Sequence, residues 1–106
     1  MKQCVFCKIV KGEIPAKIEF EDEKILVIHD INPKAPLHLL IIPKKHIKDL
    51  TTDNEGYWNK IGEVIKMLLK VKELKGVRLV HNIGISAEVP HMHFHFLENV
   101  AATRGL

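Results

Sequence analysis

Three histidines at alternate positions, His91, His93 and His95, are the residues of this chain best suited to carry chemistry. The residues between and after them are apolar: Met92, Phe94, Phe96 and Leu97. This alternation with a period of two is typical of a β-strand, which would point the three imidazoles to one face. Neutral imidazole is a nucleophile, a proton carrier and a metal ligand near pH 7. A purely structural role, or a simple His-x-His metal site, is the alternative that the spacing leaves open.

Length and composition indicate one globular domain over residues 1–106. A chain of 106 residues with 46% apolar and 27% charged residues can bury a core but has little room for a second domain. The net charge of +3 is modest, and the lysines are spread in pairs along the chain. A dedicated nucleic-acid binder would show a basic face interleaved with aromatic residues. We therefore expect no nucleic-acid partner.

The N-terminal residues predict neither secretion nor membrane insertion. The chain begins Met-Lys-Gln-Cys without an apolar signal region, and no apolar run approaches the length of a membrane span. We expect a cytoplasmic protein. In that setting the pair Cys4-x-x-Cys7 favours a metal or redox role over a structural disulfide. A thioredoxin-like role fits poorly, because the β-α-β context that it needs is absent.

The remaining pattern predicts an α+β fold with an antiparallel sheet of about five strands. Residues 1–12 favour a short helical turn that ends at Gly12. Residues 16–21 and 24–30 favour a hairpin, and the nearly continuous apolar run 37–42 favours a central strand. Further strands are predicted at residues 77–83 and 91–97, joined by a loop at 84–90. Residues 98–106 form a short tail that we expect to be frayed.

One long helix is predicted at about residues 54–74, packed on the sheet. Residues 52–55 have the spacing of a capping box, and Gly76 suits the helix stop. The predicted apolar stripe consists of Trp58, Ile61, Val64, Ile65, Leu68 and Leu69. We expect this helix to serve core packing, with no ligand role.

Several segments together resemble the histidine triad family. They are residues 4–16 (CVFCKIVKGEIPA), Glu21-Asp22, residues 29–33 (HDINP), Ala35-Pro36-x-His38, residues 40–47 (LIIPKKHI) and the triad HMHFHFL at 91–97. The similarity runs from about residue 4 to 97 and is greatest to the nucleoside phosphoramidase-type branch. It implies hydrolysis of a purine nucleoside monophosphate from an amine or phosphate-type leaving group.

By this resemblance the reaction proceeds through a covalent nucleotidyl-histidine on His93. Such an intermediate divides one difficult displacement into two easier ones. His91 and His95 would orient the nucleophile or bind phosphate oxygens, and His38 joins the catalytic group. The alternative for His38 is a buried strand histidine with one satisfied hydrogen bond.

The resemblance also assigns a nucleotide site. Asp30 would accept hydrogen bonds from the ribose hydroxyls. Asn82 aligns with an asparagine near the phosphate, and Glu88 aligns with a position in the loop before the triad. The apolar slot for the base would consist of Phe6, Ile9, Ile28, His29 and Ile31. The alternative for its apolar members is ordinary core packing.

A zinc site is implied by the same alignment. Cys4, Cys7, His46 and His91 match the zinc ligands of many members of the family. Two thiolates and two imidazoles complete a tetrahedral Zn²⁺ site with no open position, so its role would be structural. A pair of reduced thiols without metal is the alternative.

Two departures from the family pattern affect the expected function. The loop 84–90 is about two residues shorter than usual, and Ala87 stands where glutamine is common. The segment after Leu97 is also short. A nucleotide-binding module with weakened catalysis is therefore an alternative, and a metal-centred hydrolase that uses the triple-histidine face is another. The resemblance further implies a homodimer, which we expect to form on the long helix and residues 77–83.

Overall fold

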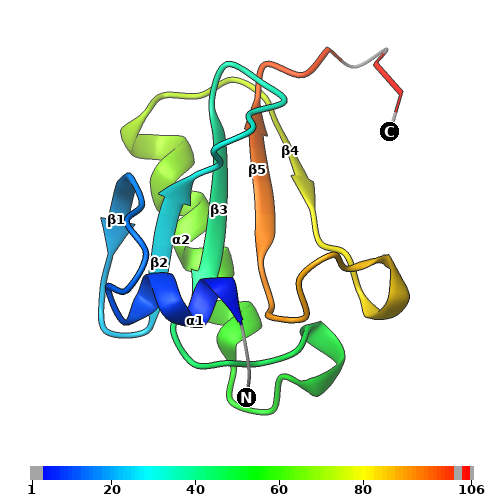
Figure 1. The fold of residues 1–106 in the computed structure, drawn as a ribbon. Helices are drawn as coiled ribbons and strands as arrows, with labels where there is room; N and C mark the ends of the chain where they lie inside the picture. Colours follow the sequence, from blue (N-terminus) through cyan, green and yellow to red (C-terminus); the bar gives the residue numbers. More distant parts are fainter. Residues whose placement is uncertain (1–3, 102–103, 106) are drawn as a thin grey trace.

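Five strands form one antiparallel sheet in the order β1-β2-β3-β5-β4, which confirms the predicted α+β fold (Figure 1). The computed structural model describes residues 4–101 and 104–105. Its helices and strands are α1 (Val5–Val10), β1 (Ile18–Glu21), β2 (Ile25–His29), β3 (His38–Pro43), η1 (Leu50–Thr52), α2 (Tyr57–Val71), β4 (Val77–Val80), η2 (Gly84–Ser86) and β5 (Phe94–Glu98).

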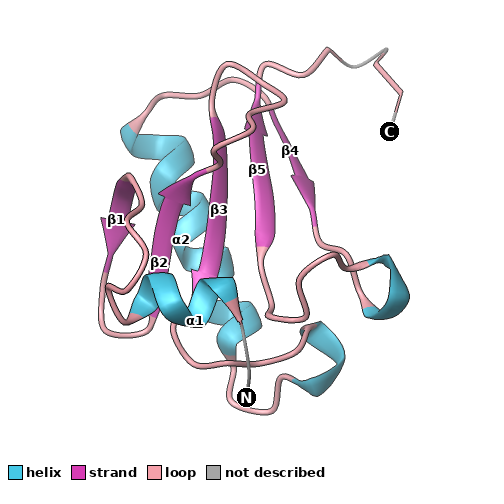
Figure 2. Cartoon of the chain, in the orientation of Figure 1, coloured by secondary structure: helices cyan, strands magenta, loops and turns pink. Residues whose placement is uncertain are grey.

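The two helices cover opposite faces of the sheet, with α2 behind it and α1 in front in Figure 2. On the α2 face, Ile41 of β3 and Phe94 and Phe96 of β5 pack against Ile61 and other residues of α2 in one buried cluster. On the α1 face, the alternate residues Leu40 and Ile42 of β3 pack with Phe6 in a second cluster. Because side chains alternate along a strand, the histidines of β3 and β5 share the face of α1.

Strand β3 is the middle of the sheet, as its apolar sequence predicts. It pairs with β2 on one side and with β5 on the other, and every one of its residues is buried. The register places Leu40 opposite His95 and His38 opposite Leu97. A strand covered on both faces needs apolar residues at consecutive positions, which explains the run 39–42.

The start of the long helix differs from the prediction. Helix α2 begins at Tyr57 rather than near residue 54, and its N-cap is Gly56 with a left-handed φ of 80°. The Asp53 carboxylate accepts the N–H groups of Tyr57 and Trp58 at 3.1 and 2.7 Å. The predicted capping box at residues 52–55 is wrong: Thr52 belongs to a box with Asp49 that opens η1.

The buried stripe of α2 also differs from the prediction in its first turn. Tyr57 is 7% exposed and lies in register with Ile61, Val64 and Leu68, whereas Trp58 is 51% exposed. Ile65 and Leu69 pack at the margin of the cluster. Trp58 was therefore wrongly predicted as a full member of the stripe: its ring lies 5.6 Å from that of Phe94 but stays half exposed at the edge of the core.

The helix ends at a Schellman motif rather than at Gly76. Glu73 takes the left-handed conformation with a φ of 52°, its N–H donates to Lys70 O, and the Leu74 N–H donates to Leu69 O. This pair of hydrogen bonds closes a helix at the residue before the left-handed one. Leu74 packs against the core, so this contact compensates for the strained φ of a non-glycine residue.

Strand β5 begins later than predicted, at Phe94 rather than at residue 91. The Met92 N–H donates to Ile47 O at 2.6 Å, so the segment before β5 is held by the loop after β3. Met92 still lies in the α2-face cluster with Phe94 and Phe96, and the predicted alternation therefore extends beyond the strand. In the tail, residues 102–103 and 106 lie outside the described residues, so the predicted fraying there stays a prediction.

Replacing Ile61 with alanine is expected to lower the free energy of unfolding by about 2–5 kcal/mol, because Ile61 is fully buried at the centre of the α2 face. Urea denaturation followed by circular dichroism measures the change. The exposed Lys66 of the same helix provides the control: Lys66→Ala should alter stability by no more than about 0.5 kcal/mol. Equal losses in the two variants would contradict this packing.

Among the described residues, no helix combines the length and apolar character needed to cross a membrane.

Candidate active site beside a cysteine–histidine cluster

A hollow of about 460 Å³ opens on the α1 face of the sheet, between the N-terminal part of β5 and the loop 84–89. Its volume is typical of sites for small molecules. Its lining combines titratable and apolar residues: Phe6, Asp30, Leu40, Asn82, Ile85, Ser86, Ala87, Glu88, Val89, His93 and His95. A second hollow of about 450 Å³ shares four of them and adds the cationic residues Lys34, Arg78 and Arg104.

His93 presents one ring nitrogen that is available for reaction. Its Nδ1 lies 2.8 Å from the carbonyl oxygen of His91, an acceptor, so Nδ1 carries the proton. The lone pair is then on Nε2. Burial of the ring, which is 6% exposed, is the main cause that lowers the pKa of His93 and keeps it neutral. A neutral, oriented imidazole at the edge of a hollow has the properties of a nucleophile.

His38 and His95 form a hydrogen-bonded pair next to His93, and their partners define the tautomer of each ring. The Lys34 N–H donates to His38 Nδ1 at 3.0 Å, so His38 carries its proton on Nε2. That Nε2 lies 2.9 Å from His95 Nδ1 and 3.4 Å from an Asp30 carboxylate oxygen. His95 Nδ1 therefore accepts, and its own proton is on Nε2. Burial is the main cause that lowers the pKa values of both histidines.

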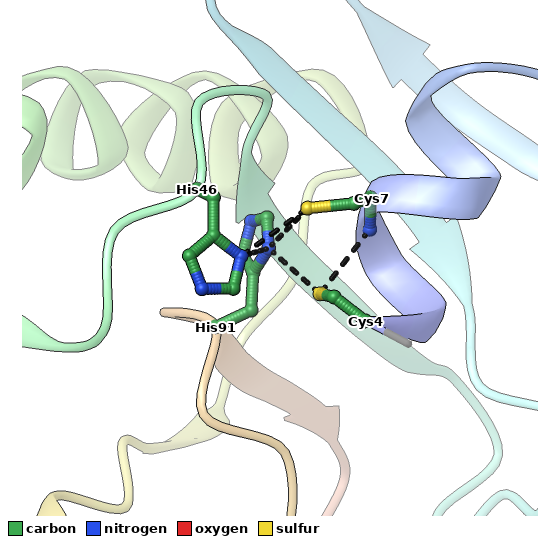
Figure 3. Close-up of side chains that lie close together, drawn as sticks. All are labelled: Cys4, Cys7, His46 and His91. Carbon is green, nitrogen blue, oxygen red and sulfur yellow. Dashed lines mark hydrogen bonds between the residues drawn. The ribbon is translucent and has the colours of Figure 1, made fainter. Parts of the chain in front are cut away.

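His91 faces away from the hollow toward two cysteines. Its ring is fully buried, and Nε2 donates to the carbonyl of Pro43 at 2.8 Å. The lone pair on Nδ1 therefore lies toward Cys4 Sγ at 3.3 Å, Cys7 Sγ at 3.6 Å and His46 Nδ1 at 3.1 Å (Figure 3). Burial lowers the pKa of His91 to about 4, and burial together with the neighbouring Cys4 raises the pKa of the Cys7 thiol.

These four side chains fit a zinc ion. Their donor atoms all lie within 4.8 Å of one another, and Cys7 Sγ is 3.2 Å from His46 Nδ1. Around tetrahedral zinc, with bonds of about 2.0–2.3 Å, sulfur and nitrogen donors are about 3.3–3.8 Å apart. The Pro43 carbonyl fixes the His91 tautomer that exposes Nδ1, which is the usual outer support of a metal-ligating histidine.

The structure brings together some, but not all, of the residues assigned by resemblance. Phe6, Asp30, Asn82, Glu88, His93 and His95 line the hollow, and His38 bonds to His95 behind it. The other assigned nucleotide residues do not line it. Ile28 is buried beneath Phe6, Ile9 packs beside that cluster, Ile31 is 89% exposed, and His29 pairs with Glu19 at 2.8 Å.

Two sets of lining residues were not predicted as site residues. The first set forms an apolar part of the wall of the hollow and consists of Leu40 and Val89. The second set comes from η2 and the residue after it, and consists of Ile85, Ser86 and Ala87. Leu40 could have been found from its alternation with His38 on β3. The family pattern pointed to the loop 84–90 but not to which of its residues reach the hollow, because the path of this shortened loop depends on what holds it in the fold.

Comparisons with known proteins agree with this arrangement. The family described as scavenger mRNA decapping enzyme C-term binding matches residues 3–106. An uncharacterized HIT-like protein of Methanocaldococcus jannaschii is 45% identical over 100 residues, covering 89% of this chain and 77% of that protein. The chain belongs to the histidine triad family. Its predicted membership is thereby confirmed, although the branch is not specified.

Solved structures of histidine triad proteins share the whole fold. A HIT family hydrolase from Legionella pneumophila is 44% identical, with a TM-score of 0.87 over 95% of this chain and 96% of that one. A histidine triad nucleotide-binding protein from Candida albicans is 38% identical, with a TM-score of 0.81 over 89% and 73%. A zinc-bound histidine triad family protein from Mycobacterium smegmatis is 31% identical, with a TM-score of 0.83 over 96% and 78%.

Proposed function

We propose that this chain is a hydrolase that removes a nucleoside monophosphate, preferably a purine one, from an amine or phosphate-type leaving group. The observation that carries the proposal is the neutral His93 ring, whose Nδ1–H is held by the His91 carbonyl while His93 lines the hollow. The described relatives include a hydrolase and a nucleotide-binding protein of the same fold, which supports both halves of the proposal.

In the first step the Nε2 lone pair of His93 attacks the α-phosphorus. A phosphorus–nitrogen bond forms, the bond to the leaving group breaks, and the leaving group takes that electron pair together with a proton supplied by solvent. The ring becomes positively charged, and its Nδ1–H bond to the His91 carbonyl stabilises this charge. His95, with its proton on Nε2 and its Nδ1 held by His38, would donate a hydrogen bond from Nε2 to a phosphoryl oxygen or to the leaving group.

In the second step water attacks the nucleotidyl-histidine. The attacking water loses a proton to solvent, the phosphorus–nitrogen bond breaks, and the electron pair returns to His93 Nε2. The nucleoside monophosphate leaves with the water oxygen. The test is direct: the protein is mixed with an adenosine phosphoramidate, quenched in alkali and examined by mass spectrometry. A nucleotidyl adduct on the peptide that contains His93 supports the proposal, whereas binding without an adduct or turnover supports the binding-module alternative.

Asp30 is proposed to bind the ribose. It lines both hollows, and its carboxylate also accepts the Asn32 N–H at 2.8 Å, which fixes its position. Replacing Asp30 with asparagine keeps the size of the side chain but removes the charged acceptor. Charge-assisted hydrogen bonds contribute about 1.5–3 kcal/mol, so KM should rise about 10- to 100-fold.

Steady-state kinetics on ribose and dideoxyribose substrates measure this effect for Asp30. The wild type should lose affinity for the dideoxy substrate, and Asp30→Asn should show almost no further loss. An equal loss of affinity in both proteins would contradict ribose recognition by Asp30.

Cys4, Cys7, His46 and His91 are proposed to hold a structural Zn²⁺. The zinc-bound relative and the four convergent donor atoms support this. The ion would join the start of α1 to the loop after β3 and to the residue two positions before His93. Its chemistry is to neutralise the two thiolates and hold these segments together, with no open position for water.

A catalytic metal on the triple-histidine face is less compatible with the hydrogen bonds. His91 is engaged with the cysteines, so the three histidines do not converge on one point. Asp30, His38 and His95 do have ligand atoms within 4.8 Å of one another. However, the His38 Nε2 proton already occupies the lone pair of His95 Nδ1, so a cation would have to displace that proton.

We also propose a homodimer formed through α2 and β4. Strand β4 is one edge of the sheet, and exposed apolar side chains lie on or beside these two elements: Trp58, Val71, Leu79 and Ile83. An edge strand with apolar side chains favours pairing with another chain. Light scattering is expected to give twice the monomer mass for wild type and a monomer for Leu79→Glu. Ile18→Glu, on the opposite edge strand β1, should remain dimeric; dissociation of both variants, or of neither, would contradict this surface.

A further inference from the structure

The backbone of His93 lies where the regular sheet ends. Strand β4 pairs with β5 only from Val77 opposite Glu98 to Val80 opposite His95. Beyond Val80 no ladder pairing between these strands continues, and His93 precedes the first residue of β5. A nucleophile outside the ladder needs another support for its backbone, because unpaired segments move more than paired ones.

A side chain supplies that support. The Nδ1 of His81, the residue directly after β4, lies 3.0 Å from the His93 carbonyl oxygen. The carbonyl is an acceptor, so His81 carries its proton on Nδ1 and its lone pair on Nε2. That Nε2 accepts the Leu50 N–H at 3.1 Å. One neutral tautomer of His81 therefore satisfies both contacts, and its ring stacks on Phe94 with centroids 4.3 Å apart and planes at 18°.

The far end of this connection is rigid. Leu50 begins η1, which is closed by the reciprocal box between Asp49 and Thr52. Asp49 is only 2% exposed, and its carboxylate accepts the Thr51 N–H at 2.9 Å and the Gly84 N–H at 3.2 Å. The same turn thus holds the His81 ring and Gly84, the first residue of η2, and the other two residues of η2 line the hollow. A buried, fully bonded carboxylate makes this turn a fixed reference point.

We propose that His81 is a positioning residue for the nucleophile: it links the His93 carbonyl to the η1 turn and so fixes the distance from His93 Nε2 to the phosphorus. The inference rests on the proposed function. His81 lies outside the two hollows and acts only through His93 and the loop. The ring of His93 is then fixed by the His91 carbonyl and its backbone by His81, so both ends of the nucleophile are held.

Two amide variants separate this role from general packing. The amide nitrogen of asparagine lies near the position of histidine Nδ1, and the amide of glutamine lies near that of Nε2. His81→Asn can therefore still donate to the His93 carbonyl, whereas His81→Gln can accept the Leu50 N–H but leaves that carbonyl without its donor. Both variants lose the ring stacked on Phe94, so each controls for loss of packing in the other.

The experiment measures the single-turnover rate of nucleotidyl transfer to His93, together with KM and Tm, in wild type and both variants. A misplacement of the reacting atoms by about 1 Å costs about 100-fold in rate. His81→Gln is expected to slow nucleotidyl transfer about 10- to 100-fold with KM little changed, and His81→Asn to recover most of that loss at a similar Tm. Equal losses in both variants, no loss in His81→Gln, or a change in KM alone would overturn the inference.

A second measurement does not depend on activity. Nitrogen-15 NMR of the histidine side chains distinguishes protonated from unprotonated ring nitrogens, and His81 is expected to be protonated on Nδ1 and unprotonated on Nε2. The opposite tautomer would overturn the inference. If wild type forms no adduct at all, the proposed function fails together with the positioning role. If wild type reacts and His81→Gln reacts equally fast, only the role of His81 fails.

Discussion

Replacing His93 with alanine is expected to abolish turnover of an adenosine phosphoramidate, with kcat reduced by at least about 10⁴-fold. The loss is large because the proposed nucleophile makes the covalent bond itself, and neither of the other two triad histidines is placed to repeat it. His95 Nδ1 is already bonded to His38, and the lone pair of His91 faces the cysteines. The measurement is steady-state release of adenosine monophosphate, with the covalent adduct followed in parallel by mass spectrometry.

Two controls accompany the His93 variant. Lys66→Ala on the exposed side of α2 tests handling and folding, and it should retain wild-type turnover. His95→Ala should still form the adduct on His93, but more slowly, since it removes a hydrogen-bond donor to the phosphoryl group or the leaving group rather than the nucleophile. If the His93→Ala variant retains turnover, or if a nucleotidyl adduct forms on any of its peptides, another residue attacks the phosphorus.

Removal of the proposed zinc ion is the change with the second large expected effect. A ligand that binds only the folded state stabilises it by about 4 kcal/mol when its free concentration is about a thousand times Kd. For a domain of this size that corresponds to a rise in Tm of about 15–30 °C. Cys7→Ser should therefore lose the metal and most of this increment, because a hydroxyl is a much poorer zinc ligand than a thiolate. Elemental analysis and thermal denaturation with and without a chelator measure both quantities.

The control for the metal is His38→Ala. His38 belongs to the other group of metal-capable side chains, with Asp30 and His95, so its loss should leave one zinc per chain. If zinc is instead retained in Cys7→Ser and lost in His38→Ala, the ion lies on the catalytic face and the metal-centred alternative is correct. If Cys7→Ser loses zinc but keeps hydrolysis, the structural role is supported.

The pattern of apolar residues determined most of the fold. The run at residues 39–42 predicted a central strand, and β3 is the middle strand with all its residues buried. The alternation of Met92, Phe94 and Phe96 predicted which side of the triad segment enters the core. These predictions succeed because a strand buried on one face alternates apolar and polar residues, whereas a strand buried on both faces is apolar throughout.

The ends of the elements were less predictable. The spacing at residues 52–55 and the glycine at 76 are ordinary boundary signals, yet α2 begins at Tyr57 and ends at the left-handed Glu73. Asp53 caps the helix from outside, and Leu74 packs on the core to close it. Such contacts depend on the position of other segments, so local propensity alone does not decide them.

The sequence alone determined the types of chemistry: three alternate histidines, a cysteine pair and the resemblance that joins them to Asp30, Asn82 and His46. Only the tertiary structure decided how each ring is used. The three triad histidines, His91, His93 and His95, are the same residue type on the same face of the sheet. Their hydrogen-bond partners, which come from β3 and from the triad segment itself, determine which ring nitrogen of each histidine keeps its lone pair. Because a histidine's role depends on where its proton is, and that depends on partners up to 57 residues away in the chain, spacing could predict the site but not the assignment of its members.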